Sequence, residues 1–247
     1  MRDYLKYKLL IPFILLFGFF PVIGFPQFAP AAGSPGSTAI HMDSNIFVNW
    51  ATNCSIVIGQ EDISNPQSVL ASAGDSTMAI GAPGNGVVSL GDGGYAVLTF
   101  ERPIKNGNGW DFAIFENSFS NTFLELGLVE VSSDGLNYFQ FESTSLTQDT
   151  LQIDAFGTIN PEMINNLAGK YRATFGTPFD LEELAFEQGL DVNNITHIKI
   201  IDVIGSIDPA IGTYDQFGNI INDPFPTPFP SSGFDLDAIG VIHEQPL

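Results

Sequence analysis

Two carboxylates near the end of the chain are spaced so that both could face one ligand. Asp235 and Asp237, in the stretch FDLD, are two residues apart at the start of an apolar run. Side chains two residues apart in a β-strand point to the same side, so these charges repel unless a cation or hydrogen-bond donors compensate them. Glu116 and Asn117, which follow another short apolar run, offer a further carboxylate and an amide carbonyl.

Hard oxygen ligands of this kind suit Ca²⁺, which takes six to eight of them. The sequence therefore predicts a structural calcium ion, with Glu116, Asn117, Asp235 and Asp237 as candidate ligands. A different role stays open for the last two. Asp235 could cap the turn before it and Asp237 could accept hydrogen bonds from backbone amides, and neither role needs an ion.

A second polar set lies in the loop from Asp202 to Phe229, which is long for a connection without secondary structure and is stiffened by prolines. Its aromatic residues could form a platform on which a sugar stacks, while Asp and Asn side chains fix the hydroxyl groups. The candidate ligand-binding residues are Tyr214, Asp215, Phe217, Asn219, Asn222, Asp223 and Phe225, and Phe229 is a further aromatic candidate. The alternative is that these aromatic side chains only pack the loop onto the rest of the protein.

Signals for catalysis are weak. The sequence contains no GxSxG, P-loop or HExxH motif. Hydrolysis by paired carboxylates remains open, but a chain with 28 Asp and Glu residues always offers some pair, so that signal is not specific. His197 and His243 fall in or at the end of predicted strands without metal-ligand spacing, and Cys54 has no nearby cation to lower the pKa of its thiol.

Charge and composition exclude several classes of function. The 247 residues include 8 Lys and Arg against 28 Asp and Glu, a formal net charge of −20. A nucleic-acid backbone binder needs clustered Lys and Arg, and adsorption to anionic lipid needs the same. A single Cys rules out an intramolecular disulfide and a Cys-based zinc site. We expect neither nucleic acid nor membrane insertion of the mature chain.

The N-terminus has the pattern of an export signal. Arg2, Lys6 and Lys8 precede an uncharged apolar run from Leu9 to Ile23, which is short for a membrane span. We expect residues 1–24 to be a signal peptide and the mature protein to be secreted or at the cell surface. Residues 25–40 are rich in Pro, Gly, Ala and Ser, which predicts a flexible lead-in before one domain over residues 41–247.

Strand patterns dominate the rest of the chain. Runs rich in β-branched and aromatic residues, bounded by Gly and Asp turns, predict strands over residues 94–100, 111–115, 124–132, 195–203 and 234–242. The turn Ser133-Asp134-Gly135 predicts a hairpin between residues 124–132 and 138–141. Helical pattern is limited to residues 160–168 and 181–188, where Asn160 and Asp180 are in capping positions. The expected fold is all-β, a β-sandwich or jelly roll with one or two short helices in long insertions.

Several motifs together resemble a family of secreted or cell-surface bacterial proteins, several of them from Bacteroidetes. In chain order they are GAPGNGVVSLGDGGYAVLTF, NGNGWDFAIFENSF, LVEVSSDG, GTPFDLEEL, ITHIKIIDV and GFDLDAIGVI, between residues 81 and 242. The resemblance implies a galactose-binding-like jelly roll, as in many carbohydrate-binding modules. In calcium-bearing modules of that kind a carboxylate of the last strand and one of an early strand share the ion, which would assign these roles to Asp237 and Glu116. Gly84 stands where the family has an acidic residue.

These observations together predict an exported cell-surface ligand-binding module, with a glycan as ligand and a structural calcium ion. A structural or adhesive protein that binds another protein is the first alternative, and a carboxylate-dependent hydrolase is the second. A glycan binder should present exposed aromatic rings with convergent polar groups. A hydrolase should hold two carboxyl groups of perturbed pKa in one cleft.

Overall fold

The described part of the chain is a β-sandwich. The computed structural model describes residues 28–246, so the predicted signal peptide, residues 1–24, lies outside the described residues. Within that range strands are the main regular structure and no helix reaches seven residues. None of the described helices is long and apolar enough to cross a bilayer. The all-β sandwich predicted from the strand patterns is therefore confirmed.

The first sheet has antiparallel strands in the order β1-β11-β6-β13-β2, and β4 pairs with the start of β13. Its central strands are β6 (Phe112–Glu116) and β13 (Asp235–Val241), close to the predicted limits. The other strands of this sheet are β1 (Ile40–His41), β2 (Asn49–Trp50), β4 (Val88–Ser89) and β11 (Phe175–Phe179).

The second sheet has the order β3-β5-β12-β7-β8, and every pair is antiparallel. The hairpin predicted around Ser133-Asp134-Gly135 joins β7 to β8, in register Glu130 to Gln140. The strands are β3 (Asn53–Val57), β5 (Tyr95–Ile104), β7 (Gly127–Ser132), β8 (Phe139–Gln140) and β12 (Ile195–Asp202). A small additional sheet pairs β9 (Thr144–Ser145) with β10 (Ile164–Asn165).

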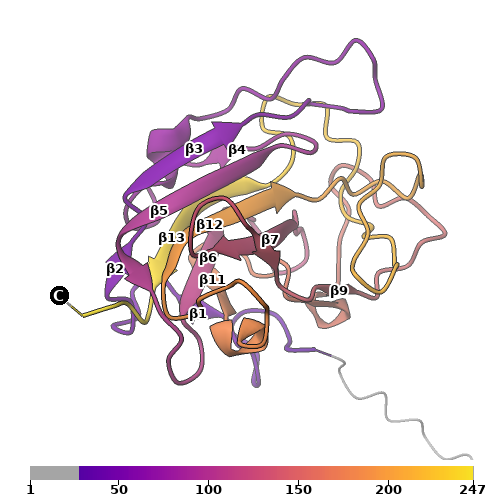
Figure 1. Ribbon diagram of the computed structural model, residues 1–247. Coiled ribbons are helices and arrows are strands. Elements are labelled where there is room, and N and C mark those ends of the chain that lie inside the picture. The colour runs from indigo at the N-terminus through magenta and orange to yellow at the C-terminus, as the bar shows by residue number, and fades with distance from the viewer. Residues whose placement is uncertain (1–27, 247) are drawn as a thin grey trace, which may run out of the picture.

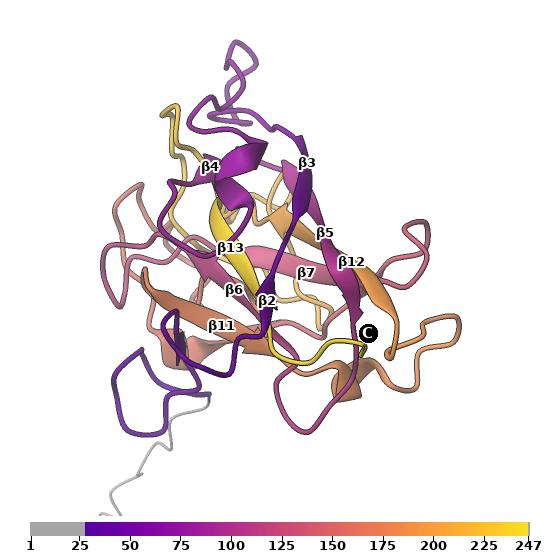
Figure 2. The same cartoon turned by 90° about the vertical axis from the view of Figure 1, so that its left-hand side faces the viewer.

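The core lies between the two sheets, which face each other as layers in Figures 1 and 2. Phe112 and Ile239 of the first sheet and Val129 and Ile198 of the second belong to one buried hydrophobic cluster, as their position in the predicted strands required. Phe112 also stacks on Phe179, with ring centroids 5.3 Å apart. Burial of apolar surface on both inner faces is the main force that holds the layers together.

Within residues 28–246, helical structure is restricted to single 3-10 turns, η1 (Ser76–Ala79), η2 (Pro161–Met163) and η3 (Leu181–Leu184). The two predicted helical segments begin where expected, with the side chains of Asn160 and Asp180 as N-caps. The first helix stops after one turn because Ile164 is extended and pairs with Ser145.

The described part of the predicted flexible lead-in, residues 28–40, is held against the sandwich. The Phe28 ring lies under the ammonium of Lys170, and the hydroxyl groups of Thr38 and Tyr171 are 2.7 Å apart. Ile40 then joins the edge of the first sheet as part of β1. The long connections between strands gather on the side of the sandwich away from the C-terminus (Figure 1).

Candidate functional site

The structure brings together three of the four predicted calcium ligands. Asp235, at the start of β13, pairs with Ser89 of β4, whose hydroxyl donates to Oδ1 of Asp235. Glu116, at the end of β6, is opposite Leu236. With its amide oriented to satisfy both neighbours, Asn117 donates to Oδ2 of Asp235 at 3.3 Å and to Oε1 of Glu116 at 3.1 Å.

Asp237 has a separate environment. The β13–β6 ladder is irregular between Leu236 and Ala238, so Asp237 is the extra residue of a β-bulge. Its Oδ1 accepts a hydrogen bond from the backbone N–H of Gly84 at 2.9 Å. This is the backbone-amide role that the sequence left open for Asp237.

The four residues do not fit an assembled calcium site. Among the residues described, no three His, Cys, Asp or Glu side chains are grouped closely enough to hold a metal ion. Both oxygens of Asp235 already accept hydrogen bonds, and Asp237 accepts one from the backbone N–H of Gly84. Calcium binding therefore stays a prediction of the sequence.

The polar residues predicted in the Asp202–Phe229 loop hold that loop together. Asp215 accepts hydrogen bonds from the backbone N–H groups of Ser145, Phe217 and Asn219, and from the Asn219 side chain, each at 2.9 Å. Asn222 is completely buried, and both its amide nitrogen and its amide oxygen make two hydrogen bonds to residues 148–153. These side chains act as internal connections.

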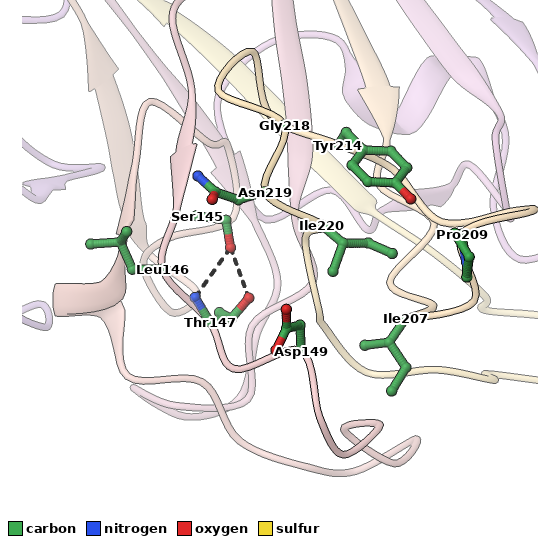
Figure 3. A pocket seen from close by; sticks show the side chains of 10 residues that line it. All are labelled: Ser145, Leu146, Thr147, Asp149, Ile207, Pro209, Tyr214, Gly218, Asn219 and Ile220. Atoms are coloured by element: carbon green, nitrogen blue, oxygen red, sulfur yellow. Dashed lines mark hydrogen bonds between the residues drawn. The ribbon is translucent and has the colours of Figure 1, made fainter.

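The aromatic members of this loop do not form one platform. Tyr214 and Asn219 line a cavity of about 400 Å³, in which Ser145 and Thr147 are hydrogen-bonded to each other (Figure 3). Phe217 is exposed and does not line this cavity, and Phe225 is buried. Phe229 lies elsewhere, in a second cavity lined by aromatic rings.

That second cavity, called here the phenylalanine pocket, has the strongest features of a binding site. Its aromatic lining residues are Phe119, Phe123, Phe156 and Phe229, and its volume is about 310 Å³. Phe119, Phe156 and Phe229 are 73%, 68% and 38% exposed, respectively. Water-exposed aromatic rings gathered around one cavity are unfavourable in an unliganded protein, which points to a ligand that covers them.

Three loops bring these rings together, and each is tied by local hydrogen bonds. Ser118 donates its hydroxyl to the carbonyl of Phe123, so that Phe119 and Phe123 stack with centroids 4.5 Å apart. Asp154 accepts from the backbone N–H of Phe156 at 3.2 Å. The Phe156 ring in turn lies 6.3 Å from that of Phe123 and 5.7 Å from that of Phe229.

Two carboxyl groups, Glu125 and Asp235, line the same pocket together with Asn117. Glu125 is only 8% exposed and, among the described residues, its side chain makes no hydrogen bond and no ion pair. It lies between Leu124 and Leu126, which are fully buried in a second apolar cluster. A buried carboxyl without a donor is rare and costly, because desolvation is not compensated.

The pocket carboxyl groups belong to a larger buried set, called here the acid cluster. It comprises Asp92, Glu116, Glu125, Asp202, Asp223 and Asp235. Burial raises the pKa of Asp92 and of Asp235 to about 6. Burial, followed by the charges of Asp235 and Asp202, raises the pKa of Glu125 well above its usual range. No ion pair among residues 28–246 includes a member of this cluster, so its carboxyl groups have no cationic partner there.

The other titratable candidates have structural partners. His243 Nδ1 lies 2.8 Å from Oδ1 of Asp111, a buried carboxylate that also accepts from the backbone of Gly107 and Leu181. Cys54 is buried, and burial raises the pKa of its thiol to about 11, which makes it a poor nucleophile.

No protein-family model matches this chain, and no curated protein matches it either. The resemblance to secreted bacterial jelly-roll proteins thus remains an expectation from the motifs.

Sequence reasoning missed Glu125, Phe119, Phe123 and Phe156 as site residues. A signal for Glu125 was present, because an acidic residue stands between two leucines at the start of the apolar run LELGLVEV. The phenylalanines gave no local signal, since they occur in three loops that only the fold brings together. Phe229 was found, but with partners from its own loop.

Proposed function

We propose that this chain is an exported ligand-binding module that takes a glycan in the phenylalanine pocket. One observation carries the proposal: exposed phenylalanine rings from three loops surround a cavity that also contains the carboxyl groups of Glu125 and Asp235. Cavities that are mostly apolar, with few and well-placed polar groups, are the usual form of small-ligand sites.

The chemistry of the pocket suits a carbohydrate. The C–H face of a sugar ring is apolar and stacks on an aromatic face, which Phe119 and Phe156 present to solvent. Sugar hydroxyl groups need acceptors, and Glu125 and Asp235 supply carboxyl oxygens next to those rings. A cavity of about 310 Å³ holds a small ligand or the end of a longer chain.

A matched pair of phenylalanine variants tests the proposal. Phe156 lies in the pocket, whereas Phe186 is 93% exposed after η3 and lines neither of the two cavities described above. We expect Phe156→Ala to weaken oligosaccharide binding about tenfold in isothermal titration calorimetry, as loss of a central aromatic contact does. Phe186→Ala should bind like the wild type. Equal loss in both variants, or no binding of any oligosaccharide by the wild type, would contradict the proposal.

Export to the cell surface or the medium is the second part of the proposal, supported by the Arg2, Lys6 and Lys8 cluster before an uncharged run. N-terminal sequencing of the protein recovered from the culture medium or the cell envelope should give a start after residue 24. Material that begins at Met1 would rule out cleavage.

A second candidate function, a carboxylate-dependent hydrolase, is favoured by the placement of Glu125 and Asp235 in one pocket, both with a pKa raised by burial. Glycoside hydrolysis uses two carboxyl groups of this kind, one of them protonated. Mass spectrometry of a bound oligosaccharide after long incubation separates the two functions. An unchanged ligand supports a binding module, and shortened products support a hydrolase.

A further inference from the structure

Glu125 differs from the rest of the acid cluster in having no hydrogen-bond donor. Asp202 accepts from the backbone N–H groups of Phe234 and Gly93 at 2.7 and 3.0 Å. The Oδ2 atom of Asp223 accepts from Leu126 at 3.0 Å. The remaining members also have donors: the backbone N–H of Ile63 donates to Asp92, that of Ser118 to Glu116, and the hydroxyl of Ser89 to Asp235. Only the Glu125 carboxyl lacks a partner among the described residues, although it is buried and lines the pocket.

The charges that face Glu125 are all negative. Asp235 and Asp202 act on it from β13 and β12, and Glu125 in turn acts on Glu116 of β6 and on Asp223 of the long loop. Within residues 28–246 no Lys or Arg side chain lines the pocket. Arg102 pairs with Glu244 and Lys199 with Glu130, and Lys170 donates to the carbonyl of Ile164. The pocket lining therefore contains two carboxyl groups and no Lys or Arg side chain.

The rings around Glu125 favour the same kind of partner. A cation held over an aromatic face is attracted by the negative charge density of the ring, and phenylalanine rings surround this pocket. A hydrated metal ion would leave these ring faces uncovered, whereas an organic cation with apolar C–H groups would cover them. No three acidic side chains approach closely enough to replace the water shell of a metal ion, within the part of the chain described.

We propose that the ligand presents a free amino group, so that the glycan carries a hexosamine unit whose ammonium pairs with Glu125 beside Asp235, while its ring stacks on the phenylalanines. This inference rests on the proposed glycan-binding function and names the class of glycan. The ammonium supplies the missing donor of Glu125 and a positive charge for the acid cluster. Charge-assisted hydrogen bonds of this kind are about twice as strong as neutral ones.

Binding should also release protons. In the free protein burial and the neighbouring carboxylates raise the pKa of Glu125 well above its usual range. A bound ammonium favours the ionised form and lowers that pKa, so protons leave the pocket as the ligand enters. The heat of binding should therefore change with the ionisation enthalpy of the buffer.

Calorimetric titration with three tetrasaccharides tests the inference near neutral pH. The ligands are a glucosamine tetramer, its fully N-acetylated counterpart and a neutral glucose tetramer of the same linkage. We expect the free-amine tetramer to bind about tenfold or more tightly than either of the others. Glu125→Gln should lose that preference, because the amide is isosteric and uncharged, and should retain the weak binding of the N-acetylated tetramer.

Two controls separate a lost contact from a lost fold. Asp149→Asn removes one exposed carboxylate that lines the Tyr214 cavity instead, and should bind all three tetramers like the wild type. Glu125→Gln removes a buried like charge, so its melting temperature should be no lower than that of the wild type. A Glu125→Gln variant that melts normally and keeps the amine preference overturns the inference.

The remaining outcomes are also decisive. Equal affinity for free-amine and N-acetylated tetramers overturns the inference and leaves the glycan-binding proposal standing. No binding of any tetramer overturns both. Buffer-independent heat with the free-amine ligand overturns the proton-linked pairing with Glu125. Titration with calcium chloride alone that gives a binding isotherm abolished by Glu125→Gln overturns the inference in favour of a metal site.

Discussion

The Oδ2 atom of Asp223 accepts a hydrogen bond from the backbone N–H of Leu126 at 3.0 Å. Through this contact the long loop before β13 fixes the segment that carries Glu125. Leu126 is also bound through its carbonyl, which accepts from Val203 at 3.0 Å. The position of the unpaired carboxyl in the pocket thus depends on a residue that does not itself line the pocket.

Asp223→Ala should lower both stability and ligand binding. The substitution leaves the buried N–H of Leu126 without an acceptor, which costs about 1–3 kcal/mol of unfolding free energy. Urea denaturation followed by circular dichroism measures this loss. Asp223→Asn, which keeps an acceptor oxygen and removes a buried charge, should be markedly less destabilising. If the alanine variant matches the wild type in both stability and affinity, this hydrogen bond contributes neither to the fold nor to the position of Glu125.

Stability should fall as the pH rises from mildly acidic to mildly basic values. The folded-state pKa values of Asp92 and Asp235 are raised to about 6 by burial. In the unfolded chain a carboxyl titrates near 4. Between these values the folded protein binds more protons than the unfolded chain, so the unfolding free energy declines with pH. Each shift of this size corresponds to on the order of 3 kcal/mol.

Four other carboxyls of the acid cluster also have pKa values raised by burial, so their titration adds to the same decline of stability with rising pH. They are Glu116, Glu125, Asp202 and Asp223. Hydrogen bonds lower the pKa of Asp75 and Asp134, which affects only the acid side of the window. Urea melts at about pH 5 and about pH 8 should show the larger free energy at the lower pH, and Asp92→Asn should flatten the difference. A protein that is more stable at the higher pH would mean that the cluster is compensated in solution.

Any stabilisation by calcium should depend on Asp235 and not on Asp237. The sequence predicts that millimolar calcium raises the melting temperature and that a chelator lowers it, with a gain of about 2.7 kcal/mol at a hundredfold excess over Kd. In the structure Asn117 donates hydrogen bonds to both Asp235 and Glu116, whereas Asp237 accepts one from the backbone N–H of Gly84. Differential scanning calorimetry of Asp235→Asn and Asp237→Asn with and without calcium distinguishes them. If the wild-type melting temperature is the same with and without calcium, the calcium prediction is wrong.

Phe112→Ala should be among the most damaging substitutions in the chain. Phe112 is completely buried, stacks on Phe179 and contacts Phe141 edge to face with centroids 5.9 Å apart. Truncation of a buried phenylalanine costs about 3–5 kcal/mol. Phe186→Ala, at an exposed position, should change the unfolding free energy by less than about 0.5 kcal/mol. Similar midpoints of urea denaturation for the two variants would refute the assignment of Phe112 to the core.

The sheets could be predicted from the sequence because their signals are local. The segment FDLDAIGVI is mostly apolar and follows a turn at Gly233, and β13 occupies all but its terminal residues. The hairpin of β7 and β8 followed from the turn Ser133-Asp134-Gly135 between two strand patterns. Helix length was less predictable, since the capping residue Asn160 marks where a helix begins and tertiary pairing of Ile164 decides where it ends.

The pocket could not be predicted because its residues share no local pattern. Phe123 and Phe156 contact each other across 33 positions of sequence, and Phe229 is further still. Residue type alone also does not separate a ligand contact from a structural one. Asp215 and Asn222 have the chemistry of sugar-binding residues, yet their hydrogen bonds are made to the protein itself.

Asn222 connects two long insertions between strands, the one that contains residues 148–153 and the loop before β13. Its two donor and two acceptor bonds join residues 148–153 to the loop before β13, and its complete burial leaves no water to replace them. The two insertions therefore form one cooperative unit that orders or melts as a whole. Transplanting either insertion alone onto another sandwich would expose unpaired backbone groups, so a graft of the pocket requires both segments together. For the same reason, changes in length in one insertion should be tolerated only with compensating changes in the other.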